Sequence, residues 1–178
     1  MSKPPPAAVL PGKQPARHHR AKNVRSSKAL ARRVHDGRVA FKAGAGGLSE
    51  LLEDIDPGVL MSKTRAGVPA VVIRDLAERL HRPLAEIGGA IGLSRATLAR
   101  KISSGATLPL AESDRTMRYV RLWALAVDLW ESDAGAAEWL TSPERSLGGE
   151  TPLHYADTEV GAQRVEHLIG QLEHGIAP

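Results

Sequence analysis

Apolar residues recur at helical spacing along most of the chain from Leu48 onward. After Pro69 the positions 71, 72, 76 and 80 are apolar, and the last such stretch covers residues 158–174. Residues spaced by three and four lie on one face of a helix, so the pattern predicts an all-α protein. From Tyr119 the stretch 114–130 is apolar nearly all round, which predicts a helix that is buried on most sides.

Residues 84–103 have the spacing of a helix-turn-helix. Gly88 suits the point where the two helices cross, and Gly92 suits a left-handed turn because it has no Cβ. Ser94 is a good N-cap, so the second helix is predicted to begin there. The apolar side of the pair consists of Ile87, Ile91, Leu93, Leu98 and Ile102.

The second helix of this pair is the candidate recognition helix. Its N-terminal residues are expected to read base edges, and Lys101 to reach a phosphate. An antiparallel helix pair with solvated arginines is the alternative, since helix-turn-helix folds do not all bind DNA. The candidate DNA-binding residues are Ser94, Arg95, Ala96, Thr97, Arg100 and Lys101.

Two tryptophans lie seven residues apart in the apolar stretch 114–130. Trp123 and Trp130 fall on one helical face, with Val127 near them. That face is either part of the core or an interface with a second copy or a partner, where aromatic residues concentrate, and both can hold at once. We take Trp123, Val127 and Trp130 as candidates for a dimer interface.

Capping residues divide the C-terminal half into short helices. Ser113 is predicted to cap the helix 114–130, and Ser142-Pro143 and Thr151-Pro152 each read as a cap followed by proline at the first helical position. Gly161 lies in the apolar stripe of the last helix and costs about 1 kcal/mol of helix propensity relative to alanine. That cost predicts a place where another backbone comes close.

Charge is distributed unevenly around the net value of +4. Residues 1–42 carry eleven lysines and arginines against one acidic residue, Asp36, whereas residues 122–178 carry two arginines against ten acidic residues. Any contact with nucleic acid is therefore expected within the first 103 residues.

The tail, residues 1–47, is rich in proline and glycine. This composition predicts disorder, although residues 25–40 could form a short basic helix. It reads as a solvated basic arm or, alternatively, as a transit peptide.

Composition excludes several classes of protein. The chain has no cysteine, so it has no disulfide, no thiolate metal site and no cysteine nucleophile. Its seven histidines do not show the spacing of a catalytic triad or a metal site, and no glycine-rich phosphate loop occurs. No apolar run approaches the roughly 20 residues of a membrane span. We expect a soluble, cytoplasmic protein that is not an enzyme and needs no metal or cofactor.

A series of short motifs runs through residues 92–175. They are Gly92-Leu93-Ser94-Arg95-Ala96-Thr97-Leu98, Glu112-Ser113-Asp114-Arg115, Glu138-Trp139-Leu140, Pro143, Leu147-Gly148-Gly149, Pro152, Thr158-Glu159-Val160-Gly161, Val165 and Glu173-His174-Gly175. Together they resemble the motifs of the Xre-type antitoxins of RES/Xre toxin-antitoxin modules, also called the ParS or Mbc-type antitoxin family. The resemblance covers about residues 60–176. Two departures are Tyr155-Ala156, where the family often has two leucines, and Gln171, where it often has arginine.

The resemblance implies a bacterial antitoxin with two tasks. It would bind a RES-domain toxin that depletes NAD, and it would act on its own promoter DNA, as a homodimer within the toxin-antitoxin complex. The implied domains are a tail (1–47), a helix-turn-helix domain (48–112) and a toxin-binding and dimerisation domain (113–178). The alternative is a stand-alone helix-turn-helix regulator with a helical effector or dimerisation domain. The candidate toxin-binding residues are Leu147, Gly148, Gly149, Pro152, Tyr155, Thr158, Gly161, Val165, Leu168, Ile169, Leu172 and Glu173.

Overall fold

The computed structural model describes residues 47–54 and 56–175, and these residues are helical without any strand. The predicted all-α fold is therefore confirmed. The predicted tail disorder and the basic helix at 25–40 lie outside the described residues. The helices are α2 (Leu48–Leu52), α3 (Pro57–Ala66), α4 (Val71–Arg79), α5 (Leu84–Ile91), α6 (Arg95–Ser103), α7 (Leu110–Trp130), α8 (Asp133–Thr141), α9 (Pro152–Tyr155) and α10 (Glu159–Glu173), with a 3-10 turn η1 (Arg145–Leu147) before α9.

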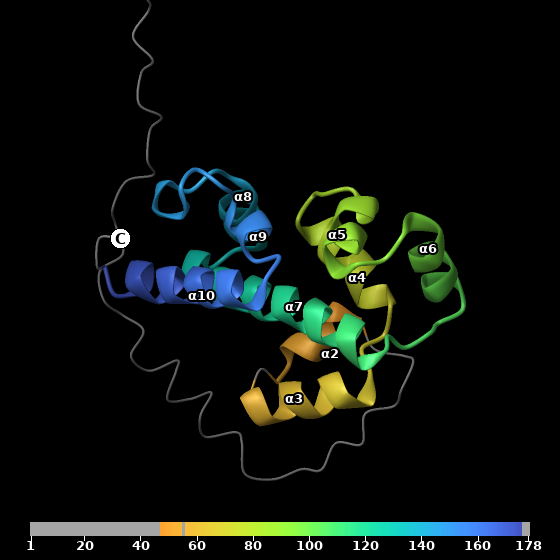
Figure 1. Cartoon of the computed structure of the whole chain (residues 1–178). Coiled ribbons are helices and arrows are strands. Elements are labelled where there is room, and N and C mark those ends of the chain that lie inside the picture. Colours follow the sequence, from red (N-terminus) through yellow and green to blue (C-terminus); the bar gives the residue numbers. More distant parts are fainter. Residues whose placement is uncertain (1–46, 55, 176–178) are drawn as a thin grey trace, which may run out of the picture. The chain divides into compact units, whose positions relative to one another are not determined.

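Helix α7 is the element around which residues 47–175 pack. It contacts α8 and α10 most extensively, and also α2, α3, α4 and α5 (Figure 1). Val120 and Trp123 are fully buried, as the apolar pattern predicts for this helix. The guanidinium of Arg79 on α4 lies 5.9 Å from the centre of the Trp123 ring, within the range of a cation–π contact.

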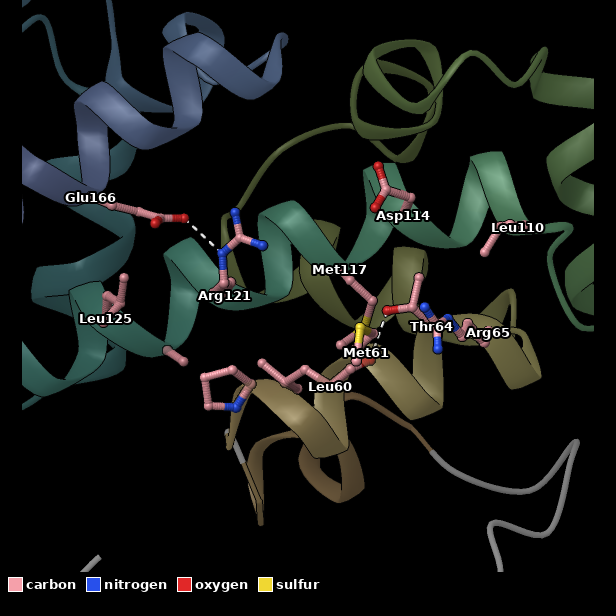
Figure 2. Close-up of a pocket in the computed structure, with 12 residues that line it drawn as sticks. Leu60, Met61, Thr64, Arg65, Leu110, Asp114, Met117, Arg121, Leu125 and Glu166 are labelled. Carbon is pink, nitrogen blue, oxygen red and sulfur yellow. Dashed lines mark hydrogen bonds and ion pairs between the residues drawn. The ribbon is translucent and has the colours of Figure 1, made fainter. Parts of the chain in front are cut away.

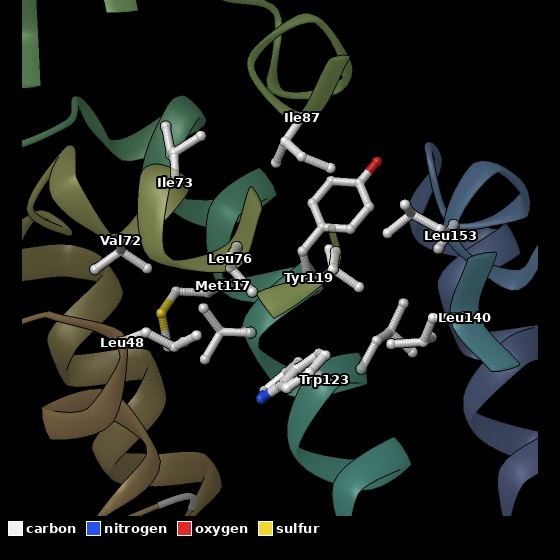
Figure 3. Packing of buried hydrophobic residues seen from close by; sticks show 14 of the residues in the cluster. Leu48, Val72, Ile73, Leu76, Ile87, Met117, Tyr119, Trp123, Leu140 and Leu153 are labelled. Atoms are coloured by element: carbon white, nitrogen blue, oxygen red, sulfur yellow. The ribbon is translucent and has the colours of Figure 1, made fainter. Parts of the chain in front are cut away.

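The two predicted helical domains share one hydrophobic core. In the cluster of buried apolar side chains, Tyr119 on α7 lies between Ile87 on α5 and Leu153 on α9 (Figure 3). Burial raises the pKa of the Tyr119 phenol, and the charge of the neighbouring Arg118 opposes that rise. The proposed domain boundary at residue 112 falls inside α7, so it stays a prediction about the division of tasks.

Ser113 is not the N-cap of α7, contrary to the prediction. The helix begins at Leu110, directly after Pro109, and Ser113 is a buried residue of its first turns. Its hydroxyl accepts a hydrogen bond from the Val68 amide at 3.0 Å and donates one to the Leu108 carbonyl at 2.9 Å. Ser113 thus satisfies buried backbone groups in two loops that meet at the start of α7, where unpaired polar groups would be costly.

The predicted cap at Ser142 is also wrong. Ser142 ends α8, and the Glu144 carboxylate instead accepts from the Ser146 amide at 3.2 Å and begins the turn η1. The other predicted caps are confirmed. Thr151 accepts from the His154 amide at 3.2 Å at the start of α9.

Candidate functional site

The turn between α5 and α6 is built on Gly92. Its φ of 88° lies in the left-handed region, which favours glycine, and this confirms the sequence prediction. The Leu93 amide donates to the Gly88 carbonyl at 2.8 Å, which closes the end of α5. Arg115 of α7 also binds here, because its Nη1 donates to the Ile91 carbonyl at 2.9 Å. A Cβ on Gly92 would lie 2.7 Å from that nitrogen, so a side chain added to the turn would also displace the end of Arg115.

The crossing of α5 and α6 depends on Gly88. A Cβ at this position would lie 2.6 Å from Cδ2 of Leu98, so the buried Leu98 side chain occupies the space that the missing side chain leaves. This confirms the predicted place of Gly88 in the motif. Ile87, Ile91 and Leu93 are buried on the same side, and α6 is therefore held against α5 by close packing.

Helix α6 exposes the predicted base-reading positions. The Ser94 hydroxyl accepts from the Thr97 amide at 3.2 Å, which confirms the N-cap and orients the first turn. Arg95, Ala96 and Arg100 are exposed, and within residues 47–54 and 56–175 neither arginine forms an ion pair. Two guanidinium groups are thus available to an anionic ligand.

Lys101 has a different position from its neighbours on α6. Its Nζ lies 3.2 Å from the carboxylate of Glu112 on α7, and its side chain is only 18% exposed. The sequence suggested a phosphate contact, whereas in the structure this lysine joins α6 to α7 by an ion pair. The difference arises because Glu112 lies in the first turn of a helix whose start the capping pattern misplaced.

The apolar stripe of α10 faces the core of the chain itself. Gly161, Val165, Leu168 and Ile169 are buried, and Leu172 is half-buried. The expectation that this stripe lies open to a partner is therefore corrected, because α7 and the helices next to it already cover it.

Gly161 confirms the predicted close approach of another backbone, but that backbone belongs to the same chain. A Cβ at Gly161 would overlap the carbonyl oxygen of Tyr155 at the end of α9. The Thr158 hydroxyl accepts from the Gly161 amide at 3.1 Å in the same turn. Gly161 therefore sets the sharp angle between α9 and α10.

Two arginines of α7 hold α10 in place, and the sequence reasoning missed them. Arg118, whose side chain is 9% exposed, donates to the Asp157 carbonyl at 2.8 Å and to the Glu159 carboxylate at 3.1 Å. Arg121 pairs with Glu166 at 2.6 Å and with Glu159 at 3.4 Å. An arginine within an otherwise apolar helix was the available signal, since buried charges are normally paired. These pairs neutralise two of the acidic residues on α10.

The remaining candidates for toxin binding divide by exposure. Leu147 and Pro152 are buried and Tyr155 is half-buried, whereas Gly148, Gly149, Thr158 and Glu173 are exposed. Close to Thr158, the Val160 side chain is 78% exposed, and the sequence reasoning did not include it among the candidates.

The three candidates for a dimer interface also divide by exposure. Trp123 is fully buried in the core, Val127 is half-buried and Trp130 is 38% exposed. Trp123 therefore belongs to the core and has no surface to offer a second copy. Of these three candidates, only Trp130, at the end of α7, presents an aromatic side chain outward.

Comparison with known proteins identifies both halves of residues 47–175. Residues 59–121 match the antitoxin Xre-like helix-turn-helix domain, and residues 125–175 match the antitoxin Xre/MbcA/ParS C-terminal toxin-binding domain. "Antitoxin Xre" of Yersinia enterocolitica is 36% identical over 119 residues, which cover 66% of this chain and 80% of that protein. The chain belongs to the Xre/MbcA/ParS antitoxin family. This confirms the resemblance and the expectation that the protein is an antitoxin and not an enzyme.

Two further relatives bear antitoxin names. "Antitoxin Xre" of Photorhabdus laumondii is 35% identical over 111 residues, which cover 62% of this chain and 75% of that protein. "Prs ADP-ribosylating antitoxin" of a Sphingobium species is 27% identical over 120 residues, which cover 62% and 76% of the two chains. By family, the C-terminal part of the chain binds a cognate toxin.

None of the helices in the described residues has the length and apolar character needed to cross a membrane. Within the same residues no three histidine or acidic side chains are grouped so that they could hold a metal ion.

Proposed function

We propose that this antitoxin neutralises a RES-domain toxin that consumes NAD, and that it represses its own promoter as a homodimer through α6. The observation that carries the proposal is the presence of two separate exposed surfaces on one packed core. One surface holds Arg95 and Arg100, and the other holds Val160 within the region that matches the toxin-binding domain.

The DNA-binding part of the proposal rests on how α6 is supported. The packing of Leu98 against Gly88 holds α6 on α5, and the ion pair between Lys101 and Glu112 holds it on α7. The exposed N-terminal half of α6 therefore has a fixed position on the domain. Arginine is the side chain that most often reads guanine in the major groove, through two parallel hydrogen bonds. We therefore assign Arg95 and Arg100 to base contacts and Ser94, Ala96 and Thr97 to the surface beside them.

The toxin-binding part rests on the exposed residues near the turn between α9 and α10. Val160 projects from the first turn of α10, and Gly148 and Gly149 leave open space around their backbone after η1. The name of the Sphingobium relative refers to ADP-ribosylation, and an ADP-ribosyl group comes from NAD. That chemistry supports an NAD-consuming enzyme as the partner, and the identity of the RES class rests on the motif resemblance.

A pair of variants tests the two surfaces against each other. Val160→Asp places a charge in the proposed toxin contact and is expected to abolish neutralisation while promoter binding persists. Arg95→Ala with Arg100→Ala is expected to weaken promoter binding by about 1 to 3 kcal/mol per arginine while neutralisation persists. Each variant is the control for the other, and both changes are at exposed side chains, so the fold should remain intact.

The measurements are fluorescence anisotropy on the promoter fragment and cellular NAD after co-expression with the proposed RES-domain toxin. Deleting residues 150–178 is a poorer test, because Val165 and Leu168 are buried against the core and their removal would expose α7. If Val160→Asp still keeps NAD high, this turn is not the toxin contact. If the wild-type chain binds its promoter but never restores NAD, a stand-alone regulator describes the protein better.

A further inference from the structure

A groove of about 510 Å³ runs between α3 and α7 and ends at α10 (Figure 2). Its floor is apolar, formed by Leu60, Met117 and Leu125, and Met61 lies beside Met117. Two of the four large apolar side chains that the described residues expose are here, Met61 at 52% and Leu110 at 60%. None of the residues that line the groove belongs to α6, so a partner bound in the groove would not need the recognition helix.

The residues that α7 contributes to the groove follow a helix-pairing pattern. Leu110, Asp114, Met117, Arg121 and Ala124 are separated by alternating steps of four and three, and Leu125 follows directly. Alternating steps of four and three form the stripe along which one helix packs against another. Leu110, at the start of this stripe, is 60% exposed, so the chain's own fold leaves part of the stripe uncovered.

The stripe would complement the same stripe of a second copy that runs in the opposite direction. Measured from the midpoint between Met117 and Arg118, Leu110 and Leu125 lie equally far on either side. Asp114 and Arg121 also lie equally far from that midpoint, and they carry opposite charges. If a second α7 packs antiparallel about this point, leucine meets leucine and carboxylate meets guanidinium at both ends of the contact.

The charged residues of the groove are available for such pairing. The Asp114 side chain is 65% exposed, and its nearest cation within the described residues is Arg118 at 4.0 Å. Arg121 uses Nε and Nη2 for Glu166 and Glu159, which leaves Nη1 without an acceptor in the described part of the chain. Arg65 on α3 is exposed at the same groove and adds a second guanidinium.

We propose that this groove is the homodimer interface and that its occupant is a second copy of the chain, with the two α7 helices antiparallel about Met117–Arg118. A two-fold contact requires a surface that complements itself, and this stripe meets that requirement in both charge and apolar position. This proposal rests on the homodimer of the proposed function and assigns the interface through which it forms. It differs from the interface at Trp130 that the sequence suggested.

Cysteine cross-linking tests the arrangement directly, because the natural chain has no cysteine to interfere. A mixture of the Leu110→Cys and Leu125→Cys variants, treated with a short bis-maleimide, is expected to give a covalent dimer. Either variant alone should give little, because like positions lie about 22 Å apart along the antiparallel helices at 1.5 Å per residue. Trp130→Cys alone and Val160→Cys mixed with Leu110→Cys are the controls, and neither should cross-link.

Light scattering on the full-length protein, without DNA or toxin, supplies the second measurement. The wild-type chain is expected to have the mass of a dimer, and Leu110→Glu to weaken dimerisation by roughly a hundredfold or more, since it buries two carboxylates against apolar side chains. Val160→Glu, at an equally exposed apolar residue outside the groove, should leave the mass unchanged.

Several results would overturn the proposal. A monomeric wild-type chain would exclude any dimer, cross-linking of Leu110→Cys with itself would show a parallel contact, and cross-linking of Trp130→Cys alone would move the interface to the end of α7. Because no toxin or promoter is present, these outcomes are independent of whether the chain neutralises a toxin or binds its promoter, and a monomeric chain would remove only the homodimer from the proposed function.

Discussion

Replacing Gly92 by alanine is expected to destabilise the helix-turn-helix through two separable effects. The backbone at φ 88° costs an alanine about 1 to 2 kcal/mol, because its Cβ crowds the following carbonyl. The new Cβ would also lie 2.7 Å from Arg115 Nη1, so the end of this side chain must shift, at the expense of its hydrogen bond to the Ile91 carbonyl. A hydrogen bond of this kind contributes about 1 kcal/mol, so the total loss of unfolding free energy is about 2 to 3 kcal/mol.

Gly105 provides the matched control for the backbone effect. Its φ is 64°, but an added Cβ would have nothing within 4 Å, so Gly105→Ala should show the left-handed penalty alone. The assay is urea unfolding followed by circular dichroism at 222 nm. We expect Gly92→Ala to be less stable than Gly105→Ala by about 1 kcal/mol, the contribution of the hydrogen bond.

A third variant tests whether Arg115 causes this difference in stability between Gly92→Ala and Gly105→Ala. In an Arg115→Ala background the hydrogen bond is already absent, so the losses for Gly92→Ala and Gly105→Ala should become equal. Equal losses already in the wild-type background would refute the reasoning, because they would show that Arg115 does not contribute to the turn.

The remaining predictions concern other parts of the chain. Deleting residues 1–42 removes a net charge of +10, which comes from eleven basic residues and one acidic residue, so affinity for arbitrary DNA should fall and its salt dependence should flatten in anisotropy titrations. A truncated chain with an unchanged salt slope would exclude the tail from DNA contact. The hydrogen bond between His154 Nδ1 and the Glu150 carboxylate raises the pKa of His154 above its ordinary value, so Glu150→Gln should lower that pKa in an NMR titration. Because the folded pKa is raised, any stability from this pair is present at low pH and is lost as the pH rises through that pKa, and an unshifted titration would contradict the pairing. Gly161→Ala should destabilise the protein through overlap with the carbonyl at the end of α9, whereas Gly170→Ala, with open space around it, should stabilise α10 by up to about 1 kcal/mol. Thermal unfolding compares the two, and equal shifts would show that the angle between α9 and α10 adjusts freely.

Local rules in the sequence determined most of the helical structure. The cap at Ser94, the left-handed Gly92 and the crossing at Gly88 were all predictable, because each depends on neighbours within a few residues along the chain. The apolar pattern likewise identified α7 as a buried helix. The family could also be identified from motif spacing, since those motifs consist of the same turns and caps.

Only the tertiary structure decided what covers each face. The stripe of α10 reads the same in sequence whether it meets a toxin or α7, and the structure places Val165 and Leu168 against the chain's own core. The pairing of Lys101 with Glu112 and of Arg118 with Glu159 was equally unpredictable. An amphipathic pattern specifies that a face must be buried, but the partner that buries it comes from residues far along the chain, and its identity follows from packing the whole domain.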